Sequence, residues 1–198
     1  MFKLLVIGLI LWVTTGFIPT KGFDSEDKTL RKELQKISGV EKPNWKEISI
    51  PSTLLASIPL EGKFIFLSPV NANEQKKYIY VGRVNSCRSG GCSNPALTMN
   101  LETSEYFDYL IVFDSNLSVQ LVKVYNYQAT HGHEVTNKGW LKQFQGYDGS
   151  RSLTVGKSID AISGATVSVY SITDDIQDKT KLLKRLIQEL STTVVSSK

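Results

Sequence analysis

Residues 158–168, SIDAISGATVS, gather small and hydroxyl-bearing side chains between a segment of strand character and a segment of helical character. Ser163 is suited to an N-cap because its hydroxyl can accept a hydrogen bond from a backbone N–H two or three residues further on. A helix beginning at Gly164 would place Thr166 in its first turn, where free N–H groups and the helix dipole favour a phosphate. The sequence therefore offers a hydroxyl at which a phosphate can be bound or attached. A plain capped helix is the alternative explanation.

The two cysteines of the chain, Cys87 and Cys92, lie in the glycine-containing stretch NSCRSGGCSN. In an exported protein we expect such a pair to form a structural disulfide that closes a tight turn. A strained, exposed disulfide is also easily reduced, so electron exchange with a redox cofactor is the alternative. We expect no metal site, because C-x4-C combined with His131 and His133 departs from the usual zinc spacings. The Cys-x-x-Cys-His pattern of covalent haem is missing from the sequence.

The elements that must position these residues begin with two pairs of strand-like segments rich in Val, Ile, Tyr and Phe. They are residues 63–67 with 77–84, and residues 106–113 with 119–127. A further short strand is predicted at residues 153–159. Neighbouring strand pairs of this kind predict two antiparallel hairpins.

Helical periodicity marks three other segments, in which apolar residues recur at spacings of three and four. They are residues 27–38 with Leu30, Leu34 and Ile37; residues 138–145 with Trp140, Leu141 and Phe144; and residues 182–190 with Leu182, Leu183, Leu186, Ile187 and Leu190. Gly39 and Gly146 are predicted to end the first two helices. The proline-punctuated residues 43–59 are predicted to form connecting loops and an edge strand. The pattern predicts an α+β fold with a mainly antiparallel sheet of two hairpins flanked by helices.

The first 22 residues differ from the rest of the chain. Lys3 precedes an apolar run over residues 4–13, which has the length of a secretory signal and falls short of the ~20 apolar residues of a comfortable membrane span. We predict a signal peptide or N-terminal anchor at residues 1–22, an N-terminal helix and loops at 23–62, and the main domain at 63–198. Export would place the protein in the periplasm or on the outer face of the cytoplasmic membrane.

The charge of the chain argues against a nucleic-acid partner. The formal net charge is +4, and it falls to +2 if Lys3 and Lys21 are removed with residues 1–22. Binding to nucleic acid requires many basic residues that neutralise phosphates. We therefore expect no nucleic acid among the partners.

The stretch Asp160-Ala161-Ile162-Ser163-Gly164-Ala165-Thr166 resembles the flavinylation motif Asp-x-x-Ser-Gly-Ala-Thr of FMN-binding domains. That family includes the flavin subunits of sodium-translocating NADH:quinone oxidoreductase and of the related Rnf electron-transport complex. In it, the last threonine carries FMN through a phosphoester that a separate flavin transferase installs from FAD. The resemblance implies an FMN-binding-domain-like fold, covalent FMN on Thr166, and a site that includes Asp160, Ser163, Gly164 and Ala165.

A looser resemblance runs from about residue 78 to residue 190. Thr130-His131-Gly132 is similar to the Thr-Pro-Gly loop of the family, and Lys157 stands just before the motif. Ala129 and His131 stand where the respiratory subunits tend to have Glu and Pro. These departures favour a stand-alone exported FMN-binding protein over a subunit of either complex.

The resemblance gives roles to several residues that also have plainer explanations. Gly132 would let the backbone approach the flavin ring, with His131 at the ring edge tuning protonation; an ordinary surface loop is the alternative. Lys157 would favour a reduced, anionic flavin, or is a solvated surface lysine. Trp140 and Phe144 would stack on the flavin or belong to the core, and a core position is the commoner one for such residues.

The function implied is that of an electron carrier more than of a stand-alone enzyme. Its expected partners are a flavin transferase, a membrane electron donor, and a redox protein or small acceptor outside the cytoplasm. One alternative is an FMN-dependent reductase that acts on a small substrate, which would require polar groups converging beside the flavin ring. The other is a non-flavin binding module in which the motif occurs by accident.

Overall fold

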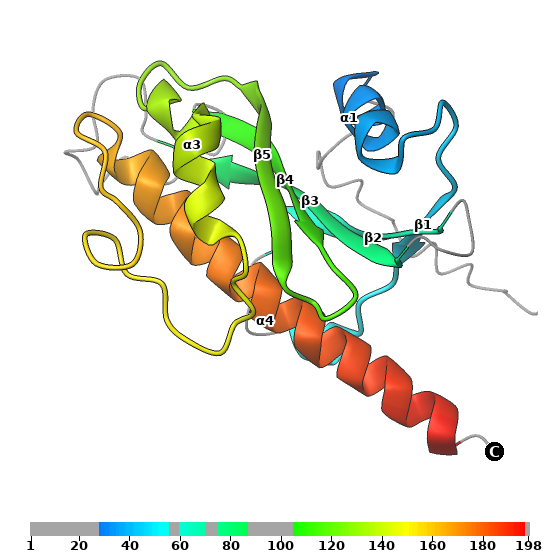
Figure 1. The fold of residues 1–198 in the computed structure, drawn as a ribbon. Coiled ribbons are helices and arrows are strands. Elements are labelled where there is room, and N and C mark those ends of the chain that lie inside the picture. The colour runs from blue at the N-terminus through cyan, green and yellow to red at the C-terminus, as the bar shows by residue number, and fades with distance from the viewer. Residues whose placement is uncertain (1–27, 56–59, 70–74, 87–104, 197–198) are drawn as a thin grey trace, which may run out of the picture.

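The computed structural model describes residues 28–55, 60–69, 75–86 and 105–196, which form three layers (Figure 1). The middle layer is a five-stranded antiparallel sheet in which each strand pairs with the next along the chain. Its strands are β1 (Trp45–Ile48), β2 (Gly62–Leu67), β3 (Lys77–Asn85), β4 (Tyr106–Phe113) and β5 (Val119–Tyr127). Both predicted hairpins, β2–β3 and β4–β5, are confirmed, as is the α+β class with an antiparallel sheet.

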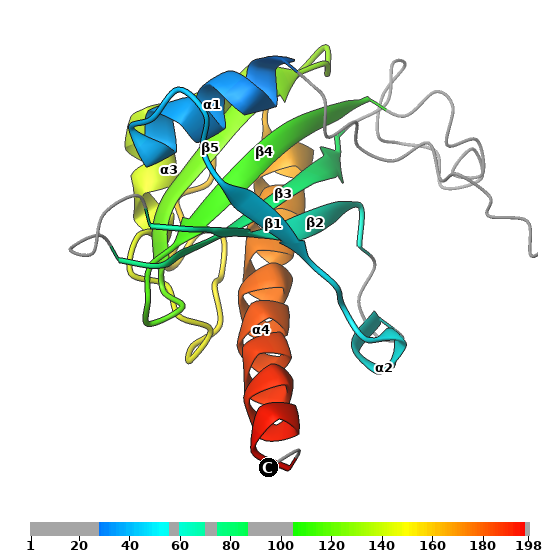
Figure 2. The same cartoon turned by 90° about the vertical axis from the view of Figure 1, so that its right-hand side faces the viewer.

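Helices cover both faces of the sheet. Helix α1 (Lys28–Ser38) lies on one face, and the 31-residue helix α4 (Thr166–Ser196) runs across the other (Figure 2). The described residues also form four short helices: α2 (Ser52–Leu55), η3 (His133–Thr136), α3 (Lys138–Leu141) and η4 (Lys142–Phe144). The predicted ends of the first two helical segments, at Gly39 and Gly146, agree with the left-handed backbone of both glycines.

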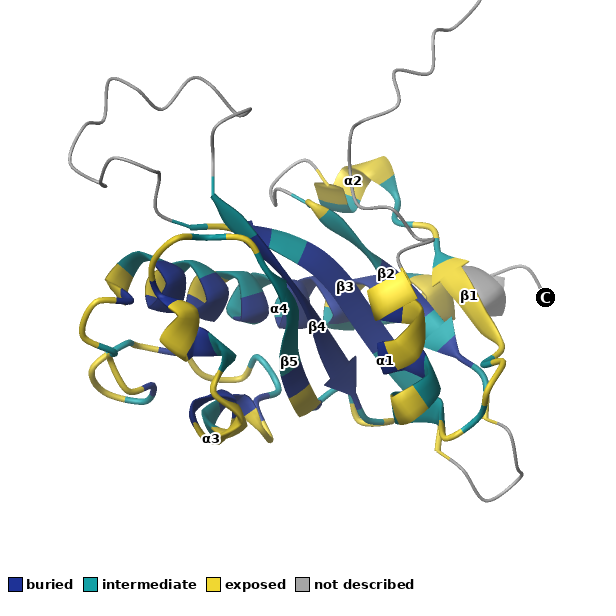
Figure 3. Cartoon of the chain, turned by 90° about the horizontal axis from the view of Figure 1, so that it is seen from above, coloured by how far each residue is buried: buried dark blue, intermediate teal, exposed yellow. Residues whose placement is uncertain are grey.

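The central strands are apolar on both faces because each face has its own helical layer, as the burial pattern in Figure 3 shows. The side chains facing α1 are Ile65, Leu67, Ile79, Val81, Leu110 and Val112, which pack with Leu30 and Leu34 of that helix. Those facing α4 include Tyr80, Phe107, Tyr109, Ile111 and Phe113, which pack with Val169, Ile172, Ile176, Leu182, Leu183 and Leu186. Alternate residues of β3 and β4 therefore belong to two separate cores, as the two-residue repeat of a strand requires.

Two sequence-based predictions about local structure are wrong. Residues 153–159 form a turn instead of a strand, with a single bridge between Val155 and Ile159. The carbonyl of Thr154 accepts hydrogen bonds from the next three N–H groups beyond Gly156, whose left-handed φ of 82° folds the chain back on itself. The apolar stripe of the last helix was also predicted one position too long, because Leu190 is 42% exposed.

Several predictions fall outside the described residues, namely the signal peptide or anchor at residues 1–22 and the pair Cys87 and Cys92. Within the described ranges, none of the helices combines the length and apolar character needed to cross a bilayer. The division of the chain at residues 22 and 62 stays a prediction.

Candidate functional site

The motif loop leads directly into α4, and Thr166 is the first residue of that helix. The carbonyl of Ala165 accepts the first helical hydrogen bond, from the N–H of Val169 at 2.9 Å, so Ala165 occupies the N-cap position. This corrects the prediction that Ser163 caps a helix starting at Gly164. Gly164 has a left-handed φ of 82° and forms a turn in which the N–H of Ala165 donates to the carbonyl of Ile162. The turn delays the helix start to Thr166.

The position of Thr166 suits a phosphoester. Its side chain is exposed, whereas the preceding Ala165 is only 2% exposed and anchors the helix start in the core. The N–H groups of the first helical turn have no carbonyl partner within the helix. Together with the positive end of the helix dipole, these groups favour an anion at this end of α4. An FMN phosphate attached there would therefore meet a favourable electrostatic environment.

The loop of His131 and Gly132 lies against this first turn. Gly132 is buried with a φ of 86°, and a Cβ added to it would lie 2.5 Å from Ser168 Oγ and 3.1 Å from the Tyr127 hydroxyl. The Tyr127 hydroxyl donates to the carbonyl of His131 at 2.5 Å, and Ser168 Oγ lies 2.7 Å from Ser86 Oγ. The fold thus brings the predicted glycine loop and the predicted attachment point together. Ser86, Tyr127 and Ser168 form the polar contact between them.

The tight packing of Gly132 gives a testable prediction. We expect Gly132→Ala to lower the free energy of unfolding by about 2 to 4 kcal/mol, from the cost of a left-handed backbone together with that of overpacking. Urea unfolding of the full chain, followed by circular dichroism, measures the loss. Gly146→Ala is the matched control, since Gly146 has a φ of 77° but no atom within 4 Å of an added Cβ. Equal losses in the two variants would contradict the tight packing of the loop on α4.

The start of the same loop is held by Glu105. Its carboxylate accepts hydrogen bonds from the Thr130 hydroxyl and, at 2.9 Å, from the Thr130 N–H. The hydroxyl bond from Thr130 is the main cause that lowers the pKa of Glu105, and the charge of His131 adds to it. Both His131 and His133 are exposed, and the His133 ring packs edge-on against the Tyr127 ring, with the ring centroids 5.2 Å apart. The two imidazoles therefore lie at the surface beside the helix start.

The other predicted site residues differ in how firmly they are held. Asp160 has an exposed side chain, but its backbone is fixed by Trp140 and Gln143 of the α3–η4 segment. Trp140 and Phe144 belong to the core, where their rings pack edge to face with centroids 5.4 Å apart. This agrees with the core position that is the commoner one for such residues. Lys157 is exposed in the turn after Gly156, and within the described ranges it forms no ion pair. Its surroundings are those of a solvated lysine.

Five residues of the site were not predicted from the sequence: Ser86, Glu105, Tyr127, Gln143 and Ser168. Each acts through a contact that the fold creates between distant segments. Gln143 and Asp160 are 17 residues apart, and Ser86 and Ser168 are 82 apart. Glu105 directly precedes one predicted strand and Tyr127 ends another. Their place at strand ends is the one sequence signal that could have indicated a role in the site.

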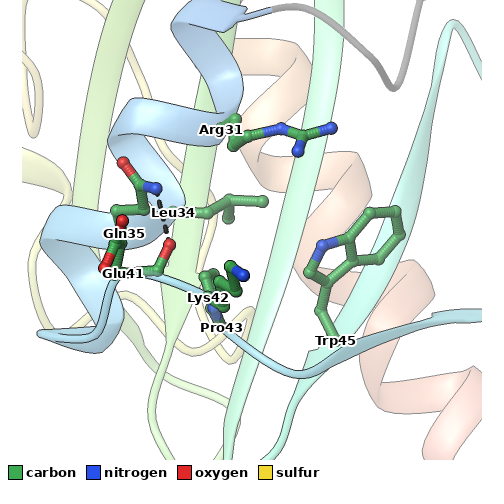
Figure 4. A pocket seen from close by; sticks show the side chains of 7 residues that line it. All are labelled: Arg31, Leu34, Gln35, Glu41, Lys42, Pro43 and Trp45. Carbon is green, nitrogen blue, oxygen red and sulfur yellow. Dashed lines mark hydrogen bonds between the residues drawn. The ribbon is translucent and has the colours of Figure 1, made fainter.

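A groove of about 270 Å³ lies on the α1 side of the sheet (Figure 4). It is lined by Arg31, Leu34, Gln35, Glu41, Lys42, Pro43 and Trp45. The Gln35 amide closes one wall by donating to the carbonyl of Glu41 at 2.6 Å. Helix α1 packs on the face of the sheet opposite to α4, so this groove is separate from the Thr166 site.

The fold thus places the exposed residue Thr166 at the start of a long helix, beside the Gly132 loop. Residues 105–181 match the family model of the FMN-binding domain. The match runs from the start of β4 to the middle of α4 and includes the Gly132 loop, α3 and the whole motif. The match supports FMN binding by this protein, in agreement with the resemblance of its motif. No curated protein and no solved structure matches the chain.

Proposed function

We propose that this protein is an exported electron carrier with FMN attached covalently, through a phosphoester, to Thr166. The observation that carries the proposal is the position of Thr166 within the FMN-binding domain. The last residue of the Asp-x-x-Ser-Gly-Ala-Thr motif is also the exposed first residue of α4. Its hydroxyl is thus offered to an enzyme from outside, and the helix start is ready to receive the phosphate.

Attachment requires a separate flavin transferase. A threonine hydroxyl is a weak nucleophile at neutral pH. Among the described side chains, none that could act as a base forms a hydrogen bond to the Thr166 hydroxyl. In the proposed transfer from FAD, Thr166 Oγ forms a bond to the phosphorus of the FMN half and loses its proton. The pyrophosphate P–O bond breaks and AMP leaves.

The covalent bond suits a carrier outside the cytoplasm, because a dissociable cofactor would be lost to the surroundings. The bound flavin supplies one-electron and two-electron chemistry, and the protein supplies position and electrostatics. The exposed helix start allows a membrane donor to deliver electrons, and a redox protein or small acceptor to remove them. His131, His133 and Lys157 are the exposed side chains that we expect to tune the flavin.

The proposal is tested by co-expressing the full chain with a flavin transferase and measuring its intact mass. We expect a single FMN-sized increment and flavin fluorescence that survives denaturing electrophoresis. Stopped-flow experiments then distinguish the carrier from a reductase. A carrier exchanges electrons with redox partners and does not turn over a panel of small organic substrates, whereas turnover of one of them would favour the enzyme. An unmodified chain after co-expression would overturn covalent attachment.

A further inference from the structure

The backbone of Asp160, the first residue of the motif, is held by the side chains of Trp140 and Gln143 in the α3–η4 segment. The indole N–H of Trp140 donates to the carbonyl of Asp160 at 2.9 Å, and the N–H of Asp160 donates to Gln143 Oε1, also at 2.9 Å. Gln143 Nε2 donates in turn to the carbonyl of Trp140 at 3.2 Å. Both backbone polar groups of Asp160 are therefore held by two side chains that are linked to each other.

The clamp formed by Trp140 and Gln143 is itself held in place by the surrounding structure. Asn137 caps α3 by accepting hydrogen bonds from the N–H groups of Gly139 at 2.8 Å and Trp140 at 3.2 Å. The Trp140 ring is 9% exposed and packs edge to face on Phe144, which is fully buried. A side chain held by core packing and a capped helix keeps one orientation. The clamp can thus fix Asp160 before any partner binds.

The other end of the motif loop is fixed as well. Ala165 is 2% exposed and belongs to the same core cluster as Trp140, and the turn at Gly164 sets the direction of the chain between them. The loop is therefore held at both ends while its functional groups face solvent. The side chains of Asp160, Ser163 and Thr166 in this loop are all exposed.

We propose that Trp140 and Gln143 are positioning residues for flavin attachment, and that the flavin transferase binds the folded motif loop and not an extended peptide. This inference rests on the proposed covalent attachment to Thr166. Fixing the loop in advance removes the ordering cost that an unfolded segment would incur on binding the transferase. The clamp engages only the backbone of Asp160, so it leaves the carboxylate available to the enzyme.

The test measures initial rates of FMN incorporation into the full chain, with purified flavin transferase, FAD and a range of chain concentrations. Trp140→Phe keeps an aromatic ring but loses the N–H, and Gln143→Ala removes the other contact. Each loses one hydrogen bond to the loop, for which we expect kcat/KM to fall roughly three- to tenfold. Gln143→Glu, which retains an acceptor for the Asp160 N–H, should recover part of the rate.

Gln145→Ala and Trp45→Phe are the matched controls. Gln145 donates to the carbonyl of Gln120, away from the motif, and Trp45 lies on β1. Both should be labelled at the wild-type rate. Melting temperatures, measured on the same samples, distinguish positioning from stability, since a purely structural role would lower them without changing the rate well below the melting range.

Wild-type rates in both Trp140→Phe and Gln143→Ala, with the label on Thr166, would overturn the positioning role but leave covalent attachment intact. Failure of the wild-type chain to acquire FMN would instead remove the proposed function, and the role of the two residues with it.

Discussion

Thr166→Ala is expected to abolish covalent flavin attachment completely and to leave the fold unchanged. Alanine lacks the oxygen that would form the phosphoester bond, so no amount of flavin transferase can restore it. The exposed first position of α4 tolerates alanine well, and we expect the free energy of unfolding to change by no more than about 0.5 kcal/mol. In-gel flavin fluorescence and intact mass measure the adduct, and urea unfolding measures the stability.

Two further variants sharpen this experiment. Thr166→Ser keeps a hydroxyl at the same position and should retain the label. Thr154→Ala removes another exposed hydroxyl, from the neighbouring turn, and should be labelled as the wild type is. Covalent flavin that persists in Thr166→Ala would show that the attachment point lies elsewhere in the chain.

The second large effect concerns stability. Asp175 and Lys179 form an ion pair within α4, with Asp175 Oδ1 2.6 Å from Lys179 Nζ, and the hydroxyl of Tyr109 on β4 donates to Asp175 Oδ2 at 2.5 Å. Lys179 is 2% exposed and lies 5.6 Å from the centroid of the Tyr80 ring. Burial raises the pKa of Asp175, although Lys179 and Tyr109 act in the opposite direction.

Asp175→Asn removes the carboxylate that neutralises a buried ammonium. Breaking a buried pair in this way typically costs about 3 to 5 kcal/mol, because one charge stays in a low-dielectric environment. We expect a loss of that size in urea unfolding of the full chain. The adjacent Asp174→Asn is the control, since the side chain of Asp174 is exposed, and it should change stability little.

A double variant separates the charge from the packing. Asp175→Asn combined with Lys179→Met removes the buried ammonium as well and fills its space with an apolar chain of similar length. We expect the double variant to be more stable than Asp175→Asn alone. If Asp175→Asn were as stable as the wild type, the ion pair would not contribute as the geometry indicates.

Much of the scaffold was predictable because its pattern is local. The strands β4 and β5 carry dense Val, Ile, Tyr and Phe, and their predicted bounds agree with the structure. Helix α1 was recognisable from Leu30 and Leu34, which repeat on one face and pack in the core. In each case, the side chains that reveal the element are also those that bury it.

The errors occurred where one backbone angle decides the local structure. The left-handed conformations of Gly156 and Gly164 turn a predicted strand into a turn and move the start of α4 to Thr166. A glycine in sequence shows that such a conformation is permitted, not that it is adopted.

The candidate site was predictable only in part. The motif located Asp160 and Thr166, but the residues that hold the surrounding loops act across the fold. The bonds from Trp140 to Asp160 and from Thr130 to Glu105 join segments 20 and 25 residues apart. Such contacts depend on how α3 and β5 pack, which no local pattern specifies.

The length and burial of α4 limit how an attached flavin can reach its partners. The helix has 31 residues, which corresponds to a rod of roughly 46 Å, and its apolar side is packed along the sheet. A group bonded to its first turn cannot move between distant partners, as a group on a flexible arm can. Donor and acceptor would have to visit the same end of the molecule in turn, so that each electron crosses only a short, fixed gap.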